Sequence, residues 1–247
     1  MDQLEGRNPV VEALKRGRRR VVRIWLDGGA RPDDRINAIL RLAGDQGVPV
    51  SKVERRELDK RSDGRVHNGV IAHAEPLVQP TTAQLIDQVF ARGEHPFVIL
   101  CSELAYEHNL GAILRSALGF GVHGVILPTR RGASLSPVVQ RVAMGGAEEV
   151  PVVRESFHSA AKHLEKAGIP LVAADLDGEP MGKARLAGPV ALVMGGEGGG
   201  LTESQRKRCS RAVRIPLAGD LESLNVSVAA AVLMAEKRRQ DGWFPTE

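Results

Sequence analysis

The sequence predicts an α/β protein of two domains, the second of them built on a parallel β-sheet. Short apolar runs alternate with helical patterns along almost the whole chain. The runs at 171–174 and 191–194 contain few polar residues, which is typical of strands covered on both faces. The stretch EPLVQPTT, at 75–82, contains two prolines and two threonines and indicates a linker between the domains.

The first domain is expected over residues 1–75, as a compact alternation of helices and strands. Helices are predicted at 8–15 and 33–44, and strands at 21–26, 48–53 and 66–72. Asn8 can cap the first helix, and Pro9 then occupies its first helical position. Residues 76–90 are expected to contain the linker and most of a helix predicted at 82–91.

The second domain is expected over residues 91–247. Its predicted strands lie at 96–101, 125–127, 150–153, 171–174 and 191–194, and its predicted helices at 109–120, 136–144 and 156–166. A basic amphipathic helix is predicted after Leu201, then a short strand that ends at Ile215-Pro216-Leu217, and then an alanine-rich helix that begins at Ser223-Leu224-Asn225. This βαβα order predicts a parallel sheet with helices on both faces.

Composition excludes several classes of protein. The 247 residues are 43% hydrophobic and 26% charged, as in soluble globular proteins, and no apolar run approaches the roughly 18–20 residues of a membrane span. The first ten residues contain no apolar signal segment, and Cys101 and Cys209 are far apart, so a reducing, cytoplasmic location is expected. The seven histidines show no metal-ligand spacing, and no metal is expected.

One formal motif match does not support dinucleotide binding. Residues 119–124, GFGVHG, fit the G-x-G-x-x-G pattern. They follow a predicted helix and precede a predicted strand, which is the reverse of the order that a phosphate-binding turn requires. A helix C-cap followed by a tight turn is the expected structure.

The excess positive charge lies entirely in the first third of the chain. Residues 1–75 contain 16 Lys and Arg against 12 Asp and Glu, a balance of 16 − 12 = +4, which equals the net charge of the whole chain. Clustered arginines favour phosphate backbones through counterion release, although a solvated arginine-rich turn would give the same pattern. Aromatic residues make up only 3% of the chain, which does not favour a base-stacking platform.

Three polar segments of the second domain are candidates for function. Asn109 can cap a helix that contains Arg115 among apolar neighbours, so this arginine either extends to solvent or faces a polar site. Glu197 is the one carboxylate of the glycine cluster GGEGGG, where it either caps a helix near Thr202 or fixes a cation such as Arg115. Ser223-Leu224-Asn225 is consistent with an ordinary helix cap.

In combination these segments resemble a known family. The patterns NLGAILRSA, MGGEGGGL, IPL and SLNVSVA occur in the order of the three motifs of TrmH-type SPOUT RNA 2′-O-methyltransferases, over residues 96–240. EGRNPVVEAL and VHNGVIA are similar to the ribosomal-protein-like RNA-binding domain of the bacterial large-subunit rRNA guanosine methyltransferases of this group. One departure is Tyr106-Glu107, which stands where the family often has Asp-Pro.

The resemblance implies a small α/β RNA-binding domain followed by a SPOUT domain with a deep C-terminal trefoil knot. It implies S-adenosylmethionine as cofactor, a homodimer, and methylation of a ribose in 23S rRNA, with a guanosine as the expected target. The implied catalytic residues are Arg115, Asn109, Glu197 and Ser223. The implied cofactor-binding residues are Gly195, Gly196, Gly198, Ile215, Leu217, Leu224 and Asn225. Arg7, Arg18, Arg19 and Arg20 are the candidate RNA contacts.

The sequence leaves two questions open. Arg115 is either the base that removes the ribose proton or the group that holds phosphate and hydroxyl in line, because arginine is normally always charged. The expected substrate is rRNA, and tRNA or a resistance-type rRNA site are the alternatives within the family. A non-catalytic RNA-binding or ribosome-assembly protein is the alternative from a different class.

Overall fold

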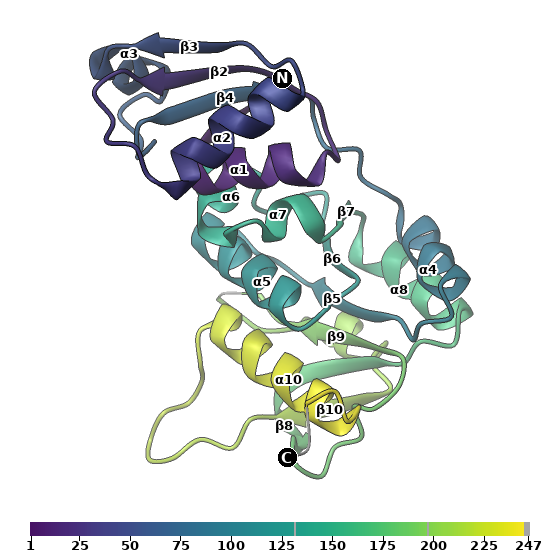
Figure 1. Ribbon diagram of the computed structural model, residues 1–247. Helices are drawn as coiled ribbons and strands as arrows, with labels where there is room; N and C mark the ends of the chain where they lie inside the picture. Colours follow the sequence, from purple (N-terminus) through teal and green to yellow (C-terminus); the bar gives the residue numbers. More distant parts are fainter. Residues whose placement is uncertain (131, 197, 245–247) are drawn as a thin grey trace. The chain divides into compact units, whose positions relative to one another are not determined.

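A computed structural model describes residues 1–130, 132–196 and 198–244 and divides the chain into two compact units (Figure 1). The first unit comprises Met1–Val78 and Ser134–Glu149, and the second comprises Gln79–Ala133 and Val150–Glu247. The division expected from the sequence was 1–75, 76–90 and 91–247. The two divisions differ mainly in the segment Ser134–Glu149, which folds with the N-terminal residues.

The first unit is a four-stranded sheet of order β1-β4-β2-β3 with three helices along residues 1–78. Its strands are β1 (Asp2–Glu5), β2 (Val21–Asp27), β3 (Val50–Val53) and β4 (Val70–Ala74), and its helices are α1 (Arg7–Arg16), α2 (Asp34–Asp45) and α3 (Arg55–Arg61). Only β2 and β3 pair in parallel, since β4 runs antiparallel to both β1 and β2. β1 and α3 had not been predicted, because both are short and rich in polar residues.

Local signals explain where these elements begin. The Asp33 side chain caps α2 by accepting a hydrogen bond from the Ile36 backbone N–H at 2.8 Å. The expected strand at 66–72 was placed too early, since β4 begins at Val70. Asn68 and Gly69 have φ angles of 48° and 79°, and two successive left-handed residues turn the chain before the strand can start.

The segment Ser134–Glu149 joins the first unit through a buried ion pair. It contains α6 (Pro137–Ala143), capped by Ser136, and α7 (Gly146–Glu149). The Arg19 guanidinium pairs with the buried Glu148 carboxylate and donates to Gln140 Oε1 at 2.7 Å. Gly145, with φ 99°, lies so close to α1 that an added Cβ would be 2.9 Å from Glu12 Cγ. This crossover therefore packs as an integral part of the N-terminal unit.

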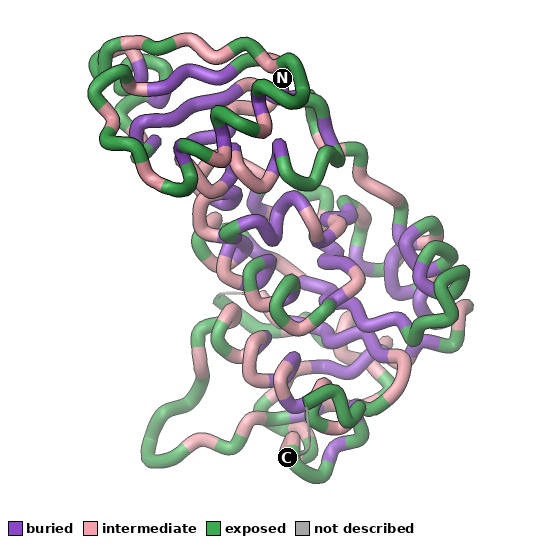
Figure 2. Tube along the Cα trace, in the orientation of Figure 1, coloured by how far each residue is buried: buried purple, intermediate pink, exposed green. Residues whose placement is uncertain are grey.

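The second unit confirms the predicted parallel sheet. Its order is β10-β8-β9-β5-β6-β7, and all five pairings are parallel. The strands are β5 (Phe97–Cys101), β6 (Gly124–Leu127), β7 (Val152–Arg154), β8 (Leu171–Pro180), β9 (Val190–Met194) and β10 (Arg211–Arg214). Every residue of the central strands β5 and β9 is buried, as Figure 2 shows.

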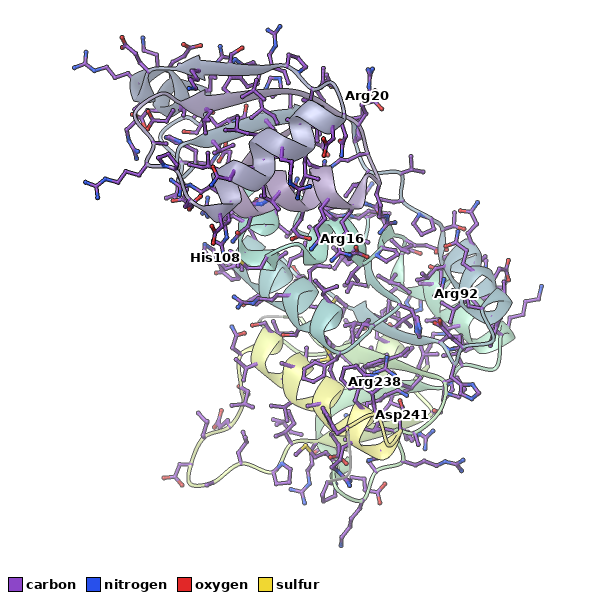
Figure 3. All side chains as sticks on the ribbon, viewed as in Figure 1. Arg16, Arg20, Arg92, His108, Arg238 and Asp241 are labelled. Atoms are coloured by element: carbon purple, nitrogen blue, oxygen red, sulfur yellow. The ribbon has the colours of Figure 1, made fainter. Side chains whose placement is uncertain are left out.

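Helices cover both faces of this sheet. They are α4 (Thr82–Ala91), α5 (Glu107–Gly119), α8 (Phe157–Lys166), α9 (Glu203–Arg206) and α10 (Val226–Gln240). On one face α4 and α8 pack with alternate residues of β5, Val98 and Leu100, in a single apolar cluster. On the other face the Phe97 ring lies 5.2 Å from Lys237 Nζ and 5.1 Å from the Arg238 guanidinium of α10. Arg238 and Asp241, at the end of α10, are labelled in Figure 3.

Two expected elements of the C-terminal region differ from the structure. β10 ends at Arg214, so Ile215-Pro216-Leu217 follows the strand, where proline has no ladder N–H to offer. The basic helix after Leu201 is only the single turn α9, which Thr202 caps. Gly121, with φ 61°, forms the expected turn after α5.

The trefoil knot stays a prediction. None of the helices in the described part of the chain is long and apolar enough to cross a membrane.

Candidate functional site

A cavity of about 980 Å³ opens at the C-terminal ends of strands β9 and β10 and beside the middle of β8 in the second unit. Ligands of open α/β sheets bind characteristically at this end of the strands. Its lining comes from the middle of β8, the glycine loop after β9, the segment after β10 and the first turns of α10, with Tyr106 and Asn109 of the α5 region. All seven expected cofactor residues line it, namely Gly195, Gly196, Gly198, Ile215, Leu217, Leu224 and Asn225.

The glycine loop after β9 is closed by its own backbone. Gly196 N–H donates to Gly200 C=O at 2.9 Å, and Gly200 N–H donates back at 3.2 Å. A Cβ on Gly195 would lie 2.8 Å from Gly200 Cα, so no side chain fits there. The loop therefore presents peptide groups to the cavity, and a larger residue at Gly195 would separate its two arms.

Asn109 and Asn225 join two segments that are 116 residues apart in the sequence. Asn225 caps α10, with Oδ1 accepting from Ser227 N–H at 2.9 Å. Its Nδ2 donates to Asn109 Oδ1 at 3.1 Å. Asn109 does not cap α5, as had been expected, because the helix begins at Glu107 and Tyr106 holds the N-cap position. The asparagine instead fixes the start of α10 against α5.

Carboxylates predominate among the charged residues of the described cavity lining. Three carboxylates line the cavity, those of Asp175, Asp177 and Glu222, together with one guanidinium, that of Arg214. Asp175 also pairs with Arg206 of α9. This balance favours a ligand with positive charge. Neither aspartate was selected from the sequence. Their position directly after the apolar run at 171–174 could have indicated a role in binding, because ligands of parallel sheets bind where such strands end.

The four expected catalytic residues occupy different positions. Asn109 and Ser223 line the cavity. Arg115 lies on the exposed face of α5 and makes no hydrogen bond or ion pair within the described part of the chain. Glu197 lies outside the described residues. The structure thus brings two of the four to the cavity and places Arg115 at the surface of the unit.

The four expected RNA contacts are already engaged in the first unit. Arg7 pairs with Asp33 and donates to Asn68 C=O at 3.1 Å. Arg18 donates to the Glu148 and Glu149 carbonyls at 3.0 and 2.6 Å. The Arg19 side chain is 1% exposed.

Arg20 differs from this set because its side chain is 73% exposed and pairs with Glu75 (Figure 3).

Burial raises the pKa of Glu148, while the neighbouring Arg19 acts in the opposite direction. A buried, paired guanidinium is unsuited to an RNA phosphate, so the buried Arg19 has a structural role.

Comparison with known proteins identifies the family. The profile described as the SpoU rRNA Methylase family matches residues 96–235, and that described as RNA 2′-O ribose methyltransferase substrate binding matches residues 3–80. The chain belongs to the SpoU rRNA methylase family. The first match spans the described cavity, and the second spans the sheet of the first unit.

Similar proteins are known over nearly the full length of the chain. The 23S rRNA (guanosine-2′-O-)-methyltransferase RlmB of Pseudomonas putida is 37% identical over 97% of this chain and 98% of its own. RlmB of Escherichia coli K12 is 36% identical over 97% and 98%. An uncharacterized tRNA/rRNA methyltransferase of Mycobacterium sp. strain KMS is 36% identical over 95% of this chain and 75% of its own.

Solved structures share the fold of this protein. The SpoU methyltransferase AviRb of Streptomyces viridochromogenes, in complex with the cofactor AdoMet, matches with a TM-score of 0.78 and 25% identity over 96% of this chain and 89% of its own. An AdoMet-bound rRNA methyltransferase of Sinorhizobium meliloti matches with a TM-score of 0.78 over 96% and 87%, at 22% identity. The SPOUT fold expected from the sequence is thereby confirmed.

Proposed function

We propose that this protein is an S-adenosylmethionine-dependent methyltransferase that modifies the 2′-hydroxyl of a guanosine ribose in 23S rRNA. The observation that carries the proposal is the match, end to end, with 23S rRNA (guanosine-2′-O-)-methyltransferases at 36–37% identity. The match includes the N-terminal unit, whereas a solved structure concerned with 2-OH methylation of C/U34 on tRNA covers only 61% of this chain. An enzyme that modifies 23S rRNA acts in the cytoplasm, so we propose a cytoplasmic location for this protein.

The cavity suits S-adenosylmethionine in size, charge and lining. About 980 Å³ is at the upper end of the range for small-molecule sites. The cofactor carries a sulfonium and an ammonium against one carboxylate, and the described lining carries more carboxylates than guanidinium groups. Glycine-loop peptide groups and the apolar Ile215, Leu217 and Leu224 would hold the adenosine. When bound, the cofactor supplies a methyl group already activated on sulfur, so the protein has mainly to position the hydroxyl and assist its deprotonation.

We assign the positioning of the ribose to Arg115, with Asn109 and Ser223 organising the cavity beside it. Arginine is a strong phosphate ligand and a poor base, so Arg115 holds the phosphate and the attacking hydroxyl in line. Asn109 is restrained by its hydrogen bond from Asn225, which keeps α5 and the start of α10 at a fixed separation. Glu197 is assigned to orient Arg115, as the family resemblance implies.

The position of Arg115 favours a homodimer in which the second copy completes the site. Arg115 and Leu118, three residues apart on α5, share an exposed face of the helix. Tyr106 is 69% exposed beside that helix, and Val228 is 48% exposed on α10. An exposed apolar group of this kind next to a catalytic candidate suits a surface that another copy covers. Sedimentation should therefore show a dimer, and a monomer would contradict this assignment.

The function can be tested by transfer of tritium from labelled S-adenosylmethionine to deproteinised 23S rRNA and, in parallel, to tRNA. We expect label in 23S rRNA alone, recovered after digestion as a 2′-O-methylguanosine. Label in tRNA, or on another 23S nucleotide, would replace the proposed substrate by one of the family alternatives. No label in either RNA, together with cofactor binding measured by calorimetry, would favour a non-catalytic protein.

A further inference from the structure

The two faces of the N-terminal sheet are covered very differently. One face carries α1 and α2 over a large apolar core that includes Ile24, Ile39 and Ala72. The opposite face has a small cluster only, in which Trp25 and Ile71 pack with Leu58 of α3 and with Val53. The short helix α3 covers part of this second face and leaves polar side chains of β1, β2 and β4 over the rest.

Trp25 is surrounded by cationic and imidazole groups on this second face. The Arg61 guanidinium lies 4.3 Å from the centroid of the indole, and the Arg23 guanidinium lies 6.0 Å from it. The His73 ring contacts the indole edge to face, with centroids 4.7 Å apart. Arg23 and His73 are direct cross-strand partners. We call this set the Trp25 face: Gln3, Arg23, Trp25, Arg61 and His73.

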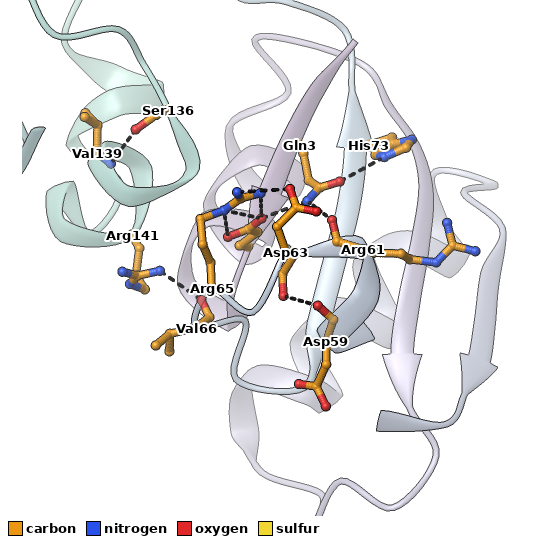
Figure 4. A network of polar contacts seen from close by, with 12 residues as sticks. Gln3, Asp59, Arg61, Asp63, Arg65, Val66, His73, Ser136, Val139 and Arg141 are labelled. Atoms are coloured by element: carbon orange, nitrogen blue, oxygen red, sulfur yellow. Dashed lines mark hydrogen bonds and ion pairs between the residues drawn. The ribbon is translucent and has the colours of Figure 1, made fainter. Parts of the chain in front are cut away.

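Hydrogen bonds hold the Trp25 face in a defined arrangement. Gln3 Nε2 donates to the Arg61 carbonyl at 2.9 Å and to Glu5 Oε1 at 2.7 Å, so its Oε1 is an acceptor and His73 Nε2–H donates to it at 3.3 Å (Figure 4). With Nε2–H donating, Nδ1 is the acceptor nitrogen in the neutral form of the ring. Burial lowers the pKa of His73, with the charge of Arg61 adding to the effect, which agrees with that neutral state.

The arginines of the Trp25 face differ from those of the arginine-rich run at 16–20. Arg23 is exposed, and the described residues give it no ion-pair or hydrogen-bond partner. Arg61 is an exposed residue whose guanidinium lies over Trp25, and its ion pair with Glu57 joins two partly exposed side chains. Such an exposed pair contributes little and can exchange for a phosphate. A guanidinium stacked on an aromatic ring also offers a planar surface to a nucleobase.

We propose that the Trp25 face is an RNA-binding surface of this protein, with Arg23 contacting a backbone phosphate and the Arg61 guanidinium stacking beneath an unpaired base. The proposal rests on the proposed function for the identity of the nucleic acid as 23S rRNA. RNA is the occupant that fits because residues 1–75 carry the entire positive excess of the chain. The neutral His73 adds an acceptor that a ribose 2′-hydroxyl can use.

The test measures binding of the full-length protein to a 23S rRNA transcript at several salt concentrations. The variants are Arg23→Gln, Arg61→Gln and the double variant, and the matched control is Arg41→Gln on the outer side of α2, where Arg41 is 69% exposed. A lost phosphate contact reduces the slope of log K against log salt by about 0.7–0.9, which is a roughly five- to eightfold loss of affinity at 0.1 M salt. We expect that loss for Arg23→Gln, a loss of about fivefold or more for Arg61→Gln because a stacked base contributes roughly 1–3 kcal/mol, about 25-fold or more for the double variant, and no change for the control.

A second measurement reports directly on the face. Trp25 and Trp243 are the two tryptophans of the chain, so Trp243→Phe leaves Trp25 as the only indole. We expect the 23S rRNA transcript to change Trp25 emission in this variant, and the added Arg61→Gln substitution to remove the change. Affinity equal to that of Arg41→Gln, or unchanged emission at saturating RNA, would overturn the proposal.

The outcomes separate this proposal from the proposed function. If the wild-type protein methylates 23S rRNA and the double variant binds and methylates equally well, only the Trp25 face is excluded. If the wild type neither binds nor methylates 23S rRNA, the function itself fails. Loss of self-association in place of RNA affinity would assign the face to a second copy of the chain and overturn the RNA site.

Discussion

The two units differ in which part of the sheet forms the binding site: the ends of the strands in the second unit, and one face of the sheet in the first. In the second unit the cavity lies at the ends of parallel strands, and glycine-loop backbone makes much of its lining. In the first unit the proposed contacts come from side chains on one face of the sheet. Substitution by shorter side chains would remove these contacts. A site built from backbone is damaged by adding atoms, whereas a site built from side chains is damaged by removing them. The difference determines which substitutions test each unit.

A second contrast lies within the first unit, between arginines that are close in sequence. Arg18 and Arg19 are used internally to bind the segment Ser134–Glu149. Arg23, only four residues beyond Arg19, points to the other side of the sheet from the apolar core and is exposed. Charge clustering alone therefore does not identify an RNA contact. The partner of each guanidinium decides its role.

Arg115→Ala should have the largest effect on catalysis. Loss of the group that holds the ribose should reduce methyl transfer to 23S rRNA by about 10²-fold or more, which is at least roughly 2.7 kcal/mol. Cofactor affinity, measured by calorimetry, should stay at the wild-type value because Arg115 lies outside the cavity lining. Wild-type turnover would remove Arg115 from the mechanism.

Arg19→Met should destabilise the protein far more than Arg20→Met. Removal of Arg19 leaves the Glu148 carboxylate buried without its cation, which typically costs about 3–5 kcal/mol. Arg20 is exposed, and its ion pair should contribute roughly 0–1 kcal/mol. Urea unfolding of both variants checks the comparison, and similar midpoints would show that Arg19 is not structural.

Gly195→Ala should weaken cofactor binding, with Gly199→Ala as the control in the same loop. The new methyl would lie 2.8 Å from Gly200 Cα, whereas a Cβ at Gly199 meets no atom within 4 Å. Overpacking of this kind costs about 1–3 kcal/mol, so we expect an increase of roughly 5- to 150-fold in the dissociation constant of S-adenosylmethionine. Equal affinities in the two variants would argue against the closed loop.

His123 should make stability depend on pH below neutrality. Burial lowers the pKa of His123, against the opposing effect of Glu94, and Nδ1 accepts the Phe97 N–H at 2.9 Å. Because the folded pKa is below the unfolded value of 6.5, the unfolded chain takes up the proton first as pH falls. The stability present above pH 6.5 is then lost as the pH falls through the lowered folded pKa of His123, at no more than about 1.4 kcal/mol per pH unit.

The measurement for His123 is the pH dependence of urea unfolding in wild type and His123→Asn. Asparagine keeps an acceptor near Phe97 N–H but does not titrate, so the variant should show a smaller slope. Part of the remaining slope belongs to His73, whose pKa burial also lowers. An identical slope in both proteins would exclude His123 as a contributor.

Much of the second unit was predictable because its signals are local. The helix at 82–91 was placed at its observed limits, and the strands β5 and β9 were placed within one residue at each end. The expected cofactor residues meet at one cavity because the ends of parallel strands necessarily share an edge.

The rest depended on contacts between distant residues. The pairing of Arg19 with Glu148 spans 129 residues, and no local pattern shows that α7 packs against α1. Trp25, Arg61 and His73 meet only through sheet register and the short helix α3, which the sequence did not reveal. The sequence likewise left open whether Arg115 extends to solvent or faces a polar site, because the exposure of Arg115 depends on how α5 packs beside α10.

The division of labour between the units is tested most directly by steady-state methylation of the 23S rRNA transcript. Arg115→Ala should lower kcat by about 10²-fold or more, and should raise the KM for RNA by no more than the roughly five- to eightfold of one lost phosphate contact. The double variant Arg23→Gln, Arg61→Gln should raise the KM for RNA by about 25-fold or more with kcat nearly unchanged. A fall in kcat for both proteins, or a wild-type KM in the double variant, would contradict the separation of RNA binding from methyl transfer.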